Sequence, residues 1–275
     1  IGLTHVSKLG APDAIEREKL SLVRYLGPES TAILNLDDPR LARATGTLSC
    51  RVLTFGSKAT GAELTWTNAR DQGLEGIRFD VRRGTGDWLD ARSPLIGVHT
   101  LPAALTALAA GLVFGLDLPE AVAALAAGSI PGRLRVLAGL RGSTLLDDTY
   151  NSSPASLAGA LNTLDSVRGE GTGRRLALLG PMAELGDFER QAHLEAGRVA
   201  AEYCDILVAV GEPCRALVEE AKASGLADTL WCDSKEEAAR RLAGMVESDD
   251  VVLLKASRST ALETIVPVLA EGGAA

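Results

Sequence analysis

The chain has 275 residues, enough for one large domain or two ordinary ones with packed cores. Its 46% apolar and 23% charged residues are typical of a soluble globular protein, and its net charge of -8 argues against nonspecific nucleic-acid binding, which requires a basic surface. The four cysteines form no C-x-x-C pair, so we expect free buried thiols in a reducing compartment.

Neither a signal peptide nor a membrane span is visible in the sequence. The longest apolar stretch, residues 101–118, contains Pro102 and many small residues, which favours a buried helix over a bilayer crossing. We therefore expect a cytoplasmic protein without membrane insertion. Because the chain begins at Ile1 and not at Met, we also expect it to be part of a longer protein.

The first half of the chain mixes strands and helices. Apolar runs, glycines and helix-favouring stretches predict these elements in order: a helix over 14–25, strands over 31–36 and 51–55, a β-hairpin over 62–83, and helices over 101–114 and 119–127. The run Ser129-Ile-Pro-Gly-Arg133 then combines Pro and Gly between a helix and a strand, which indicates a linker. We expect domains over residues 1–132 and 133–275.

The second half alternates regularly between strands and helices. Strands are predicted over 144–146, 175–179, 206–210, 229–232 and 251–254, and helices near 154–166, 187–203, 212–224, 234–246 and 259–270. Such alternation, with continuous apolar strands, predicts the α/β class and a parallel sheet covered on both faces. Ligands of such sheets bind beyond the carboxyl ends of the strands.

The run 147–154, DDTYNSSP, places several polar residues at one of these strand ends. A carboxylate there, such as Asp148, is suited to accept hydrogen bonds from ribose hydroxyls, with Tyr150 and Asn151 close behind. Pro154 then begins a helix, with Ser153 as its N-cap. The alternative is an ordinary cap and turn.

Other polar runs also follow predicted strands. Lys255, Ser257 and Arg258 lie just before a helix, an arrangement that favours a carboxylate site, although a surface basic patch is as compatible with the sequence. The run 180–186, GPMAELG, supplies Glu184 ahead of a helix that contains His193. Asn35, near the end of the strand over 31–36, and Asp38, just after it, suit either a ligand or a turn.

Three further residues are open to two interpretations. Arg133 in the linker is placed to grip a phosphate between domains or to form an interdomain salt bridge. His5 and Lys19 are, by themselves, a loop histidine and a solvated helix lysine.

In this order the motifs resemble the Mur ligase family, and the resemblance covers essentially the whole chain. The runs that carry it are IGLTHV, AILNLDDP, GVHTLPAALTALAAG, GRL, DDTYNSSPAS, LLGPMAELG with a later His, and VVLLKASR. It implies a UDP-sugar domain, a central ATPase domain and a Rossmann-like C-terminal domain. Residues 1–132 would be the downstream part of the central domain and 133–275 the C-terminal domain. No G-x-x-x-x-G-K-[ST] phosphate loop is present.

The resemblance implies an ATP-dependent amide ligase of peptidoglycan precursor synthesis. The branch that shares DDxYNxxP, LGxMxELG and VLxKxSR joins D-alanyl-D-alanine to a UDP-N-acetylmuramoyl-tripeptide through an acyl phosphate. Such an enzyme uses ATP and Mg²⁺, and we expect it to be a monomer. Without its phosphate loop, this chain alone would be inactive.

The family's residue roles extend to matching positions here. His5 and Lys19 would hold a metal, with Lys19 carbamylated and, like Arg133, catalytic. Asn35, Asp38, Arg133 and Asp148 would bind the nucleotide. Orientation of the nucleotide or dipeptide would fall to Tyr150, Asn151, Lys255, Ser257 and Arg258.

Three departures from the family pattern are visible. His99-Thr100-Leu-Pro-Ala103 stands where the family commonly has H-N-x-x-N, Pro181 replaces the Asp of LGDM, and Ala256 replaces the Gly of KGSR. Two alternatives remain: another ligase of the superfamily, similar to folylpolyglutamate synthase, or a non-catalytic module that binds nucleotide or peptide.

Overall fold

The computed structural model describes residues 1–2, 6–9, 11–128, 134–168 and 172–272. These fall into two compact units, which are described one at a time. The first holds most of the chain up to residue 128, and the second holds residues 6–8 and the chain from 134 onward.

The first unit is built on a five-stranded sheet of order β1-β2-β3-β4-β5. Its strands are β1 (Thr31–Asn35), β2 (Arg51–Ser57), β3 (Leu64–Asp71), β4 (Ile77–Arg83) and β5 (Leu89–Ser93). Strands β1, β2 and β3 pair in parallel, whereas β3, β4 and β5 pair antiparallel. The hairpin predicted over 62–83 is confirmed as β3 and β4, while β5 was missed because its five residues contain three polar side chains.

The helices of this unit are α2 (Pro12–Arg24), α3 (Pro39–Ala44), α4 (Leu101–Val113) and α5 (Leu118–Ala127). The apolar faces of α4 and α5 pack with β2, β3 and β4 around Leu64, Phe79 and Leu105, each almost fully buried. A capping box between Asp117 and Glu120 fixes the start of α5, because each side chain accepts the other's backbone N–H.

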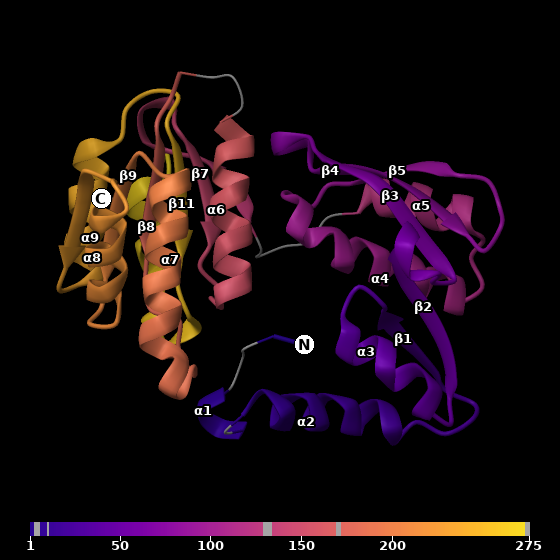
Figure 1. Cartoon of the computed structure of the whole chain (residues 1–275). Coiled ribbons are helices and arrows are strands. Elements are labelled where there is room, and N and C mark those ends of the chain that lie inside the picture. Colours follow the sequence, from indigo (N-terminus) through magenta and orange to yellow (C-terminus); the bar gives the residue numbers. More distant parts are fainter. Residues whose placement is uncertain (3–5, 10, 129–133, 169–171, 273–275) are drawn as a thin grey trace. The chain divides into compact units, whose positions relative to one another are not determined.

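The second unit is built on a six-stranded sheet of order β10-β9-β8-β11-β7-β6 (Figure 1). Its strands are β6 (Arg135–Ala138), β7 (Thr144–Asp148), β8 (Arg175–Leu179), β9 (Ile206–Val210), β10 (Asp228–Cys232) and β11 (Val251–Lys255). The strands from β10 to β7 are parallel, as predicted, and β6 is an antiparallel edge strand that was not predicted.

Helices cover both faces of this second sheet. They are α6 (Pro154–Arg168), α7 (Glu189–Tyr203), α8 (Cys214–Ala223), α9 (Lys235–Met245) and the short α10 (Val266–Leu269). Helices α6, α7 and α8 pack on one face and α9 and α10 on the other. The strands are therefore buried on both sides, which explains why their sequences are continuously apolar.

The helix predicted over 259–270 is wrong. Two 3₁₀ turns, Arg258–Thr260 and Leu262–Ile265, precede the four-residue α10. Ala261 between them adopts a left-handed conformation with φ 49°, which interrupts any continuous helix. Helical geometry resumes only just before Pro267, which is tolerated in a first turn but not in a helix interior.

Two expectations about composition can be compared with the fold. All four cysteines are free and buried, as expected. Within the described parts of the chain, none of the helices combines the length and the apolar character that a bilayer crossing requires.

Leu253, at the centre of β11, is the residue whose truncation tests this core. Its side chain is fully buried between the two helical layers, so Leu253→Ala leaves a cavity and should lower the free energy of unfolding by about 2–5 kcal/mol. Urea denaturation followed by circular dichroism measures the change. The exposed Val268→Ala should shift the same transition by less than about 0.5 kcal/mol. Equal effects of the two variants would contradict the assigned core.

Candidate functional site

Three loops meet at one edge of the second sheet. Strands β8, β11 and β7 are neighbours, and residues 149–153, 180–188 and 256–259 follow their carboxyl ends. They enclose a pocket of about 240 Å³. Its lining residues are Tyr150, Asn151, Ser152, Ser153, Ala183, Glu184, Leu185, Ser257, Arg258 and Ser259. The pocket therefore lies where ligands of open parallel sheets bind.

The two aspartates that end β7 do different things. Oδ1 of Asp147 accepts the backbone N–H of Thr149 at 3.2 Å and its hydroxyl at 2.7 Å, and Oδ2 pairs with Arg135 at 2.9 Å. Asp147 thus closes a local turn and ties β7 to the edge strand β6, which corresponds to the cap-and-turn alternative.

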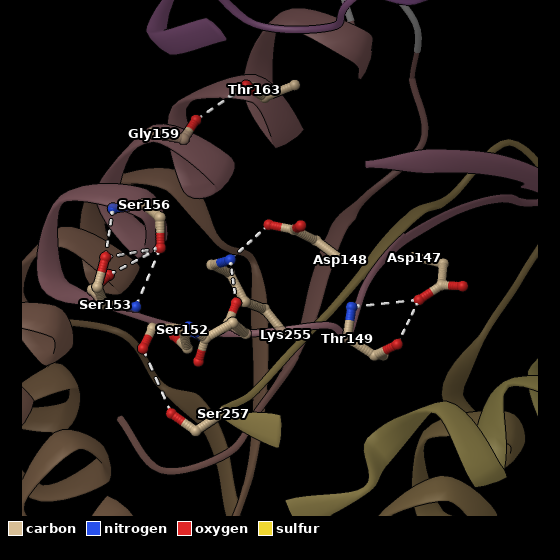
Figure 2. Close-up of polar contacts among 11 residues, drawn as sticks. Asp147, Asp148, Thr149, Ser152, Ser153, Ser156, Gly159, Thr163, Lys255 and Ser257 are labelled. Atoms are coloured by element: carbon tan, nitrogen blue, oxygen red, sulfur yellow. Dashed lines mark hydrogen bonds and ion pairs between the residues drawn. The ribbon is translucent and has the colours of Figure 1, made fainter. Parts of the chain in front are cut away.

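Asp148 instead pairs with the cation at the end of β11. Nζ of Lys255 donates to Oδ2 of Asp148 at 2.5 Å and to the backbone oxygen of Asn151 at 2.9 Å (Figure 2). The two residues lie opposite each other in the β11–β7 register. Lys255 is only 2% exposed, so its charge is compensated inside the protein.

The start of α6 forms the wall beside this ion pair. Oγ of Ser153 accepts the backbone N–H of Ser156 at 3.4 Å, and Oγ of Ser156 accepts the backbone N–H of Ser153 at 3.0 Å (Figure 2). The predicted helix start at Pro154 and the N-cap at Ser153 are confirmed.

Ser257 joins all three loops. Its backbone N–H donates to the carbonyl of Pro181 at 2.9 Å, and its hydroxyl accepts the N–H of Ala183 at 2.7 Å. The same hydroxyl donates to the carbonyl of Ser152 at 3.3 Å (Figure 2). A single buried serine thereby sets the spacing of the pocket walls.

His193 supports the loop that follows β8. It lies on α7, is fully buried, and its Nε2 accepts the backbone N–H of Met182 at 3.1 Å. Its Nδ1 lies 2.7 Å from the carbonyl oxygen of Glu189, to which the neutral ring donates. Burial lowers the pKa of His193, and the nearby Glu189 offsets this only in part.

Arg258 and Tyr150 form the exposed rim of the pocket. The guanidinium of Arg258 lies 5.6 Å from the centre of the Tyr150 ring, within the range of a cation–π contact, and 3.3 Å from the carboxylate of Glu263. Both Arg258 and Tyr150 are exposed.

The loop after β8 is also held by the start of the chain. Glu184 has a left-handed backbone with φ 63°, its carbonyl accepts the N–H of Ser7 at 3.0 Å, and its carboxylate pairs with Lys8 at 2.5 Å. No sequence pattern links residues 6–8 to a loop that lies so far along the chain, and this contact was not predicted.

The altered motif positions have a physical explanation. A Cβ at Gly180 would lie 2.6 Å from Cβ of Ala256, so the methyl group at 256 requires glycine at 180. A Cβ at Gly211 would lie 2.8 Å from Cγ of Pro181, and Gly211 has φ 91°. The two substituted residues therefore pack against glycines.

In the first unit the predicted site residues occupy a helix and a strand end. Lys19 is exposed on α2. Asn35 accepts the backbone N–H of Asp37 through Oδ1 at 2.9 Å. Asp38 caps α3 by accepting the N–H of Arg40 at 2.9 Å. His99, in the altered HTLPA segment, is exposed in a 3₁₀ turn.

The remaining predicted residues, His5 and Arg133, lie outside the described residues. Among the residues that are described, no cluster of three or more His, Cys, Asp or Glu side chains is arranged to hold a metal ion. The pocket brings together Tyr150, Asn151, Ser257 and Arg258, with Asp148 and Lys255 beside it. It also contains Ser152 and Leu185, which belong to the quoted motifs but had not been selected as site residues.

Comparison with protein families places this geometry in a known class. Residues 1–111 match the Mur ligase middle domain, and residues 132–258 match the Mur ligase glutamate ligase domain. The chain belongs to the Mur ligase family.

Curated relatives are similar over nearly the whole chain. A UDP-N-acetylmuramoyl-tripeptide--D-alanyl-D-alanine ligase from Bacillus subtilis (strain 168) is 30% identical over 98% of this chain. A ligase of the same name from Escherichia coli (strain K12) is 29% identical over 99% of the chain. The chain spans 58% and 59% of the lengths of these two relatives.

Solved structures agree on the fold. MurF from Acinetobacter baumannii superposes with a TM-score of 0.81 at 26% identity, covering 96% of this chain and 57% of that one. MurF from Thermotoga maritima in complex with ADP superposes with a TM-score of 0.77 at 24% identity, covering 98% of this chain and 59% of that one. At this identity the likeness supports the fold alone.

His193 predicts how stability depends on pH. Because the folded-state pKa is lowered, the unfolded chain binds the proton more readily than the folded chain. The stability that the neutral ring contributes is complete above a pH of about 6.5, the ordinary histidine value, and is lost as pH falls towards the folded-state pKa. As pH falls through this window, the free energy of unfolding of the wild-type chain should decrease, relative to that of His193→Gln, by up to about 1.4 kcal/mol per pH unit.

Urea unfolding of the second unit between pH 7.5 and 5 measures this difference. His5 and His99 are present in both proteins, so their titration cancels in the comparison. Parallel stability profiles for the wild type and His193→Gln would contradict the lowered pKa.

Proposed function

We propose that this chain is the downstream part of an ATP-dependent amide ligase that joins D-alanyl-D-alanine to a UDP-N-acetylmuramoyl-tripeptide. The observation that carries the proposal is the pocket at which DDTYNSSP, GPMAELG and KASR meet. Support comes from the names of relatives that are about 30% identical over nearly the whole chain. ATP would convert the tripeptide carboxylate to an acyl phosphate, and the dipeptide amine would then displace phosphate.

In this proposal, residues 1–132 are the remainder of the central ATPase domain and residues 133–275 are the C-terminal domain. The two family matches and the two compact units support a division in this region. The chain contains no phosphate loop of the G-x-x-x-x-G-K-[ST] type, which would cradle the nucleotide phosphates. We therefore propose that the chain by itself does not turn over ATP.

Four residues would bind the nucleotide. Asp148 would accept hydrogen bonds from the ribose, and Arg133 would contact the phosphates. Asn35 uses its carbonyl oxygen in its own turn, which leaves its amide group to face a ligand, and Asp38 would lie nearby.

The pocket residues would orient the nucleotide or the incoming dipeptide. Arg258 carries an exposed guanidinium beside the first turn of α6, and both favour an anionic group such as the dipeptide carboxylate. Tyr150, Asn151 and Ser257 would complete this side of the site. Lys255, whose charge is paired with Asp148, would act beside the pocket.

Magnesium would be held around Lys19 and His5. An unmodified ammonium has only donors and does not fit a cation site, whereas a carbamate on Nζ of Lys19 would offer two oxygens. The exposure of Lys19 leaves its amine open to CO₂. When bound, Mg²⁺ would neutralise charge on the phosphoryl oxygens. We further propose a cytoplasmic monomer.

Two other functions remain as alternatives. A ligase that resembles folylpolyglutamate synthase would act on folate and glutamate, and it is disfavoured by the DDTYNSSP run, where that branch would carry a D-G-A-H-N-P type motif. A non-catalytic binding module is suggested by the altered HTLPA segment and the lack of a phosphate loop.

Enzyme assays separate these functions. A longer protein that contains this chain and an upstream phosphate-loop segment should release phosphate from ATP only when both the muramoyl tripeptide and D-alanyl-D-alanine are present. The 275-residue chain alone should release none. Turnover only with folate and glutamate would refute the muramoyl assignment. Ligation by the chain alone would refute its dependence on the upstream segment.

Lys19→Ala tests the carbamate in the same longer protein. Activity should fall by roughly a hundredfold or more, the usual effect of removing one placed charge at a reacting centre. Added short carboxylates should restore part of the activity, because they supply the missing oxygens. Lys58→Ala removes another exposed lysine of the first unit and should leave the rate unchanged. Full activity of Lys19→Ala without added carboxylate would exclude the carbamate.

A further inference from the structure

Lys255 ends a strand whose following residues line the pocket. Ser257 and Arg258 are among the lining residues, whereas neither Lys255 nor its partner Asp148 is among the described residues that line the pocket. Its side chain is 2% exposed, compared with 12% for its partner Asp148. In this ion pair the carboxylate, and not the ammonium, is therefore the member that reaches towards the surface.

The contacts of Lys255 explain why a buried cation is present. An ammonium removed from water requires a counter-charge and hydrogen-bond acceptors. Asp148 supplies the charge through Oδ2 at 2.5 Å, and Asn151 supplies its backbone oxygen at 2.9 Å (Figure 2). Both partners belong to the DDTYNSSP run. The single ammonium of Lys255 therefore fixes both the Asp148 carboxylate and the loop that follows β7.

The pairing leaves the other carboxylate oxygen available. Among the described residues, no hydrogen bond reaches Oδ1 of Asp148. Lys255 and Asp148 are register partners on the paired strands β11 and β7, so the ammonium holds Oδ2 of the carboxylate from the neighbouring strand. A carboxylate with one oxygen held in this way keeps its other oxygen in one orientation.

We propose that Lys255 is a positioning residue, which turns Oδ1 of Asp148 towards the hydroxyl groups of a bound ribose and does not itself touch the ligand. This inference rests on the proposed function, in which Asp148 binds ribose. It differs from the direct ligand contact that the family resemblance implies for Lys255. Without the ammonium, the Asp148 carboxylate loses both its counter-charge and its fixed orientation.

The experiment compares two nucleotides that differ only in the ribose hydroxyls. Dissociation constants for ADP and 2′,3′-dideoxy-ADP are measured by calorimetry on the longer protein that contains this chain. Wild type should favour ADP by roughly ten- to a hundredfold, as expected for hydrogen bonds to a charged group. Lys255→Met should bring this ratio close to one. The control Lys222→Met removes an exposed lysine of α8 and should leave the ratio unchanged.

A purely structural role for Lys255 gives a different result. In that case Lys255→Met would weaken both nucleotides equally, and the unchanged ratio would overturn the proposal. Equal affinities in the wild type, or no binding of either nucleotide, would overturn it as well. Phosphate release with D-alanyl-D-alanine, measured on the same wild-type preparation, reports separately on the proposed ligase activity.

If the Lys255→Met variant does not fold, two further measurements test the proposal. The double variant Asp148→Asn with Lys255→Met removes both buried charges, so it should fold and show no preference for ADP. A retained ADP preference in it would overturn the proposal. Amine labelling of the unaltered 275-residue chain should modify Lys222 readily and spare Lys255. Equal labelling of the two lysines would also overturn it.

Discussion

Parallel pairing of β8, β11 and β7 forces three segments of the chain to leave the sheet at one edge. These segments are far apart in sequence, and each brings polar groups that would be costly to bury alone. Hydrogen bonds between the three segments offset this cost, because buried polar groups of one segment find partners in another. Ser257 supplies contacts to the other two loops, and Lys255 is neutralised by Asp148. The pocket thus exists because the loops stabilise one another, and its shape depends on a few side chains below its surface.

Most of the second unit could be predicted from the sequence, because its signals are local. Continuous apolar runs marked the buried strands, and DDTYNSSP marked both a strand end and a helix start. The edge strand β6 was missed because it has only four residues, RVLA, a run too short to indicate a strand by itself. The false helix over 259–270 shows that composition alone does not reveal a left-handed residue such as Ala261.

The sequence predicted which loops form the candidate site, but it did not predict the role of each residue in them. Sequence patterns grouped Asp147, Asp148 and Lys255 as ligand-facing residues. In the structure Asp147 closes a turn and pairs with Arg135, and Lys255 is buried and paired with Asp148. Such roles depend on strand register and on contacts over a hundred positions along the chain, which no local pattern records. The family resemblance supplied roles for His5, Lys19 and Arg133 that remain proposals.

The contact between Gly180 and Ala256 has a consequence for how these motifs vary. The ends of β8 and β11 approach so closely that two methyl groups cannot fit between them. Positions 180 and 256 therefore share one fixed volume, in which a side chain at one site requires its absence at the other. A change at either position is therefore constrained by its neighbour in space, although the two positions lie 76 residues apart in the numbering.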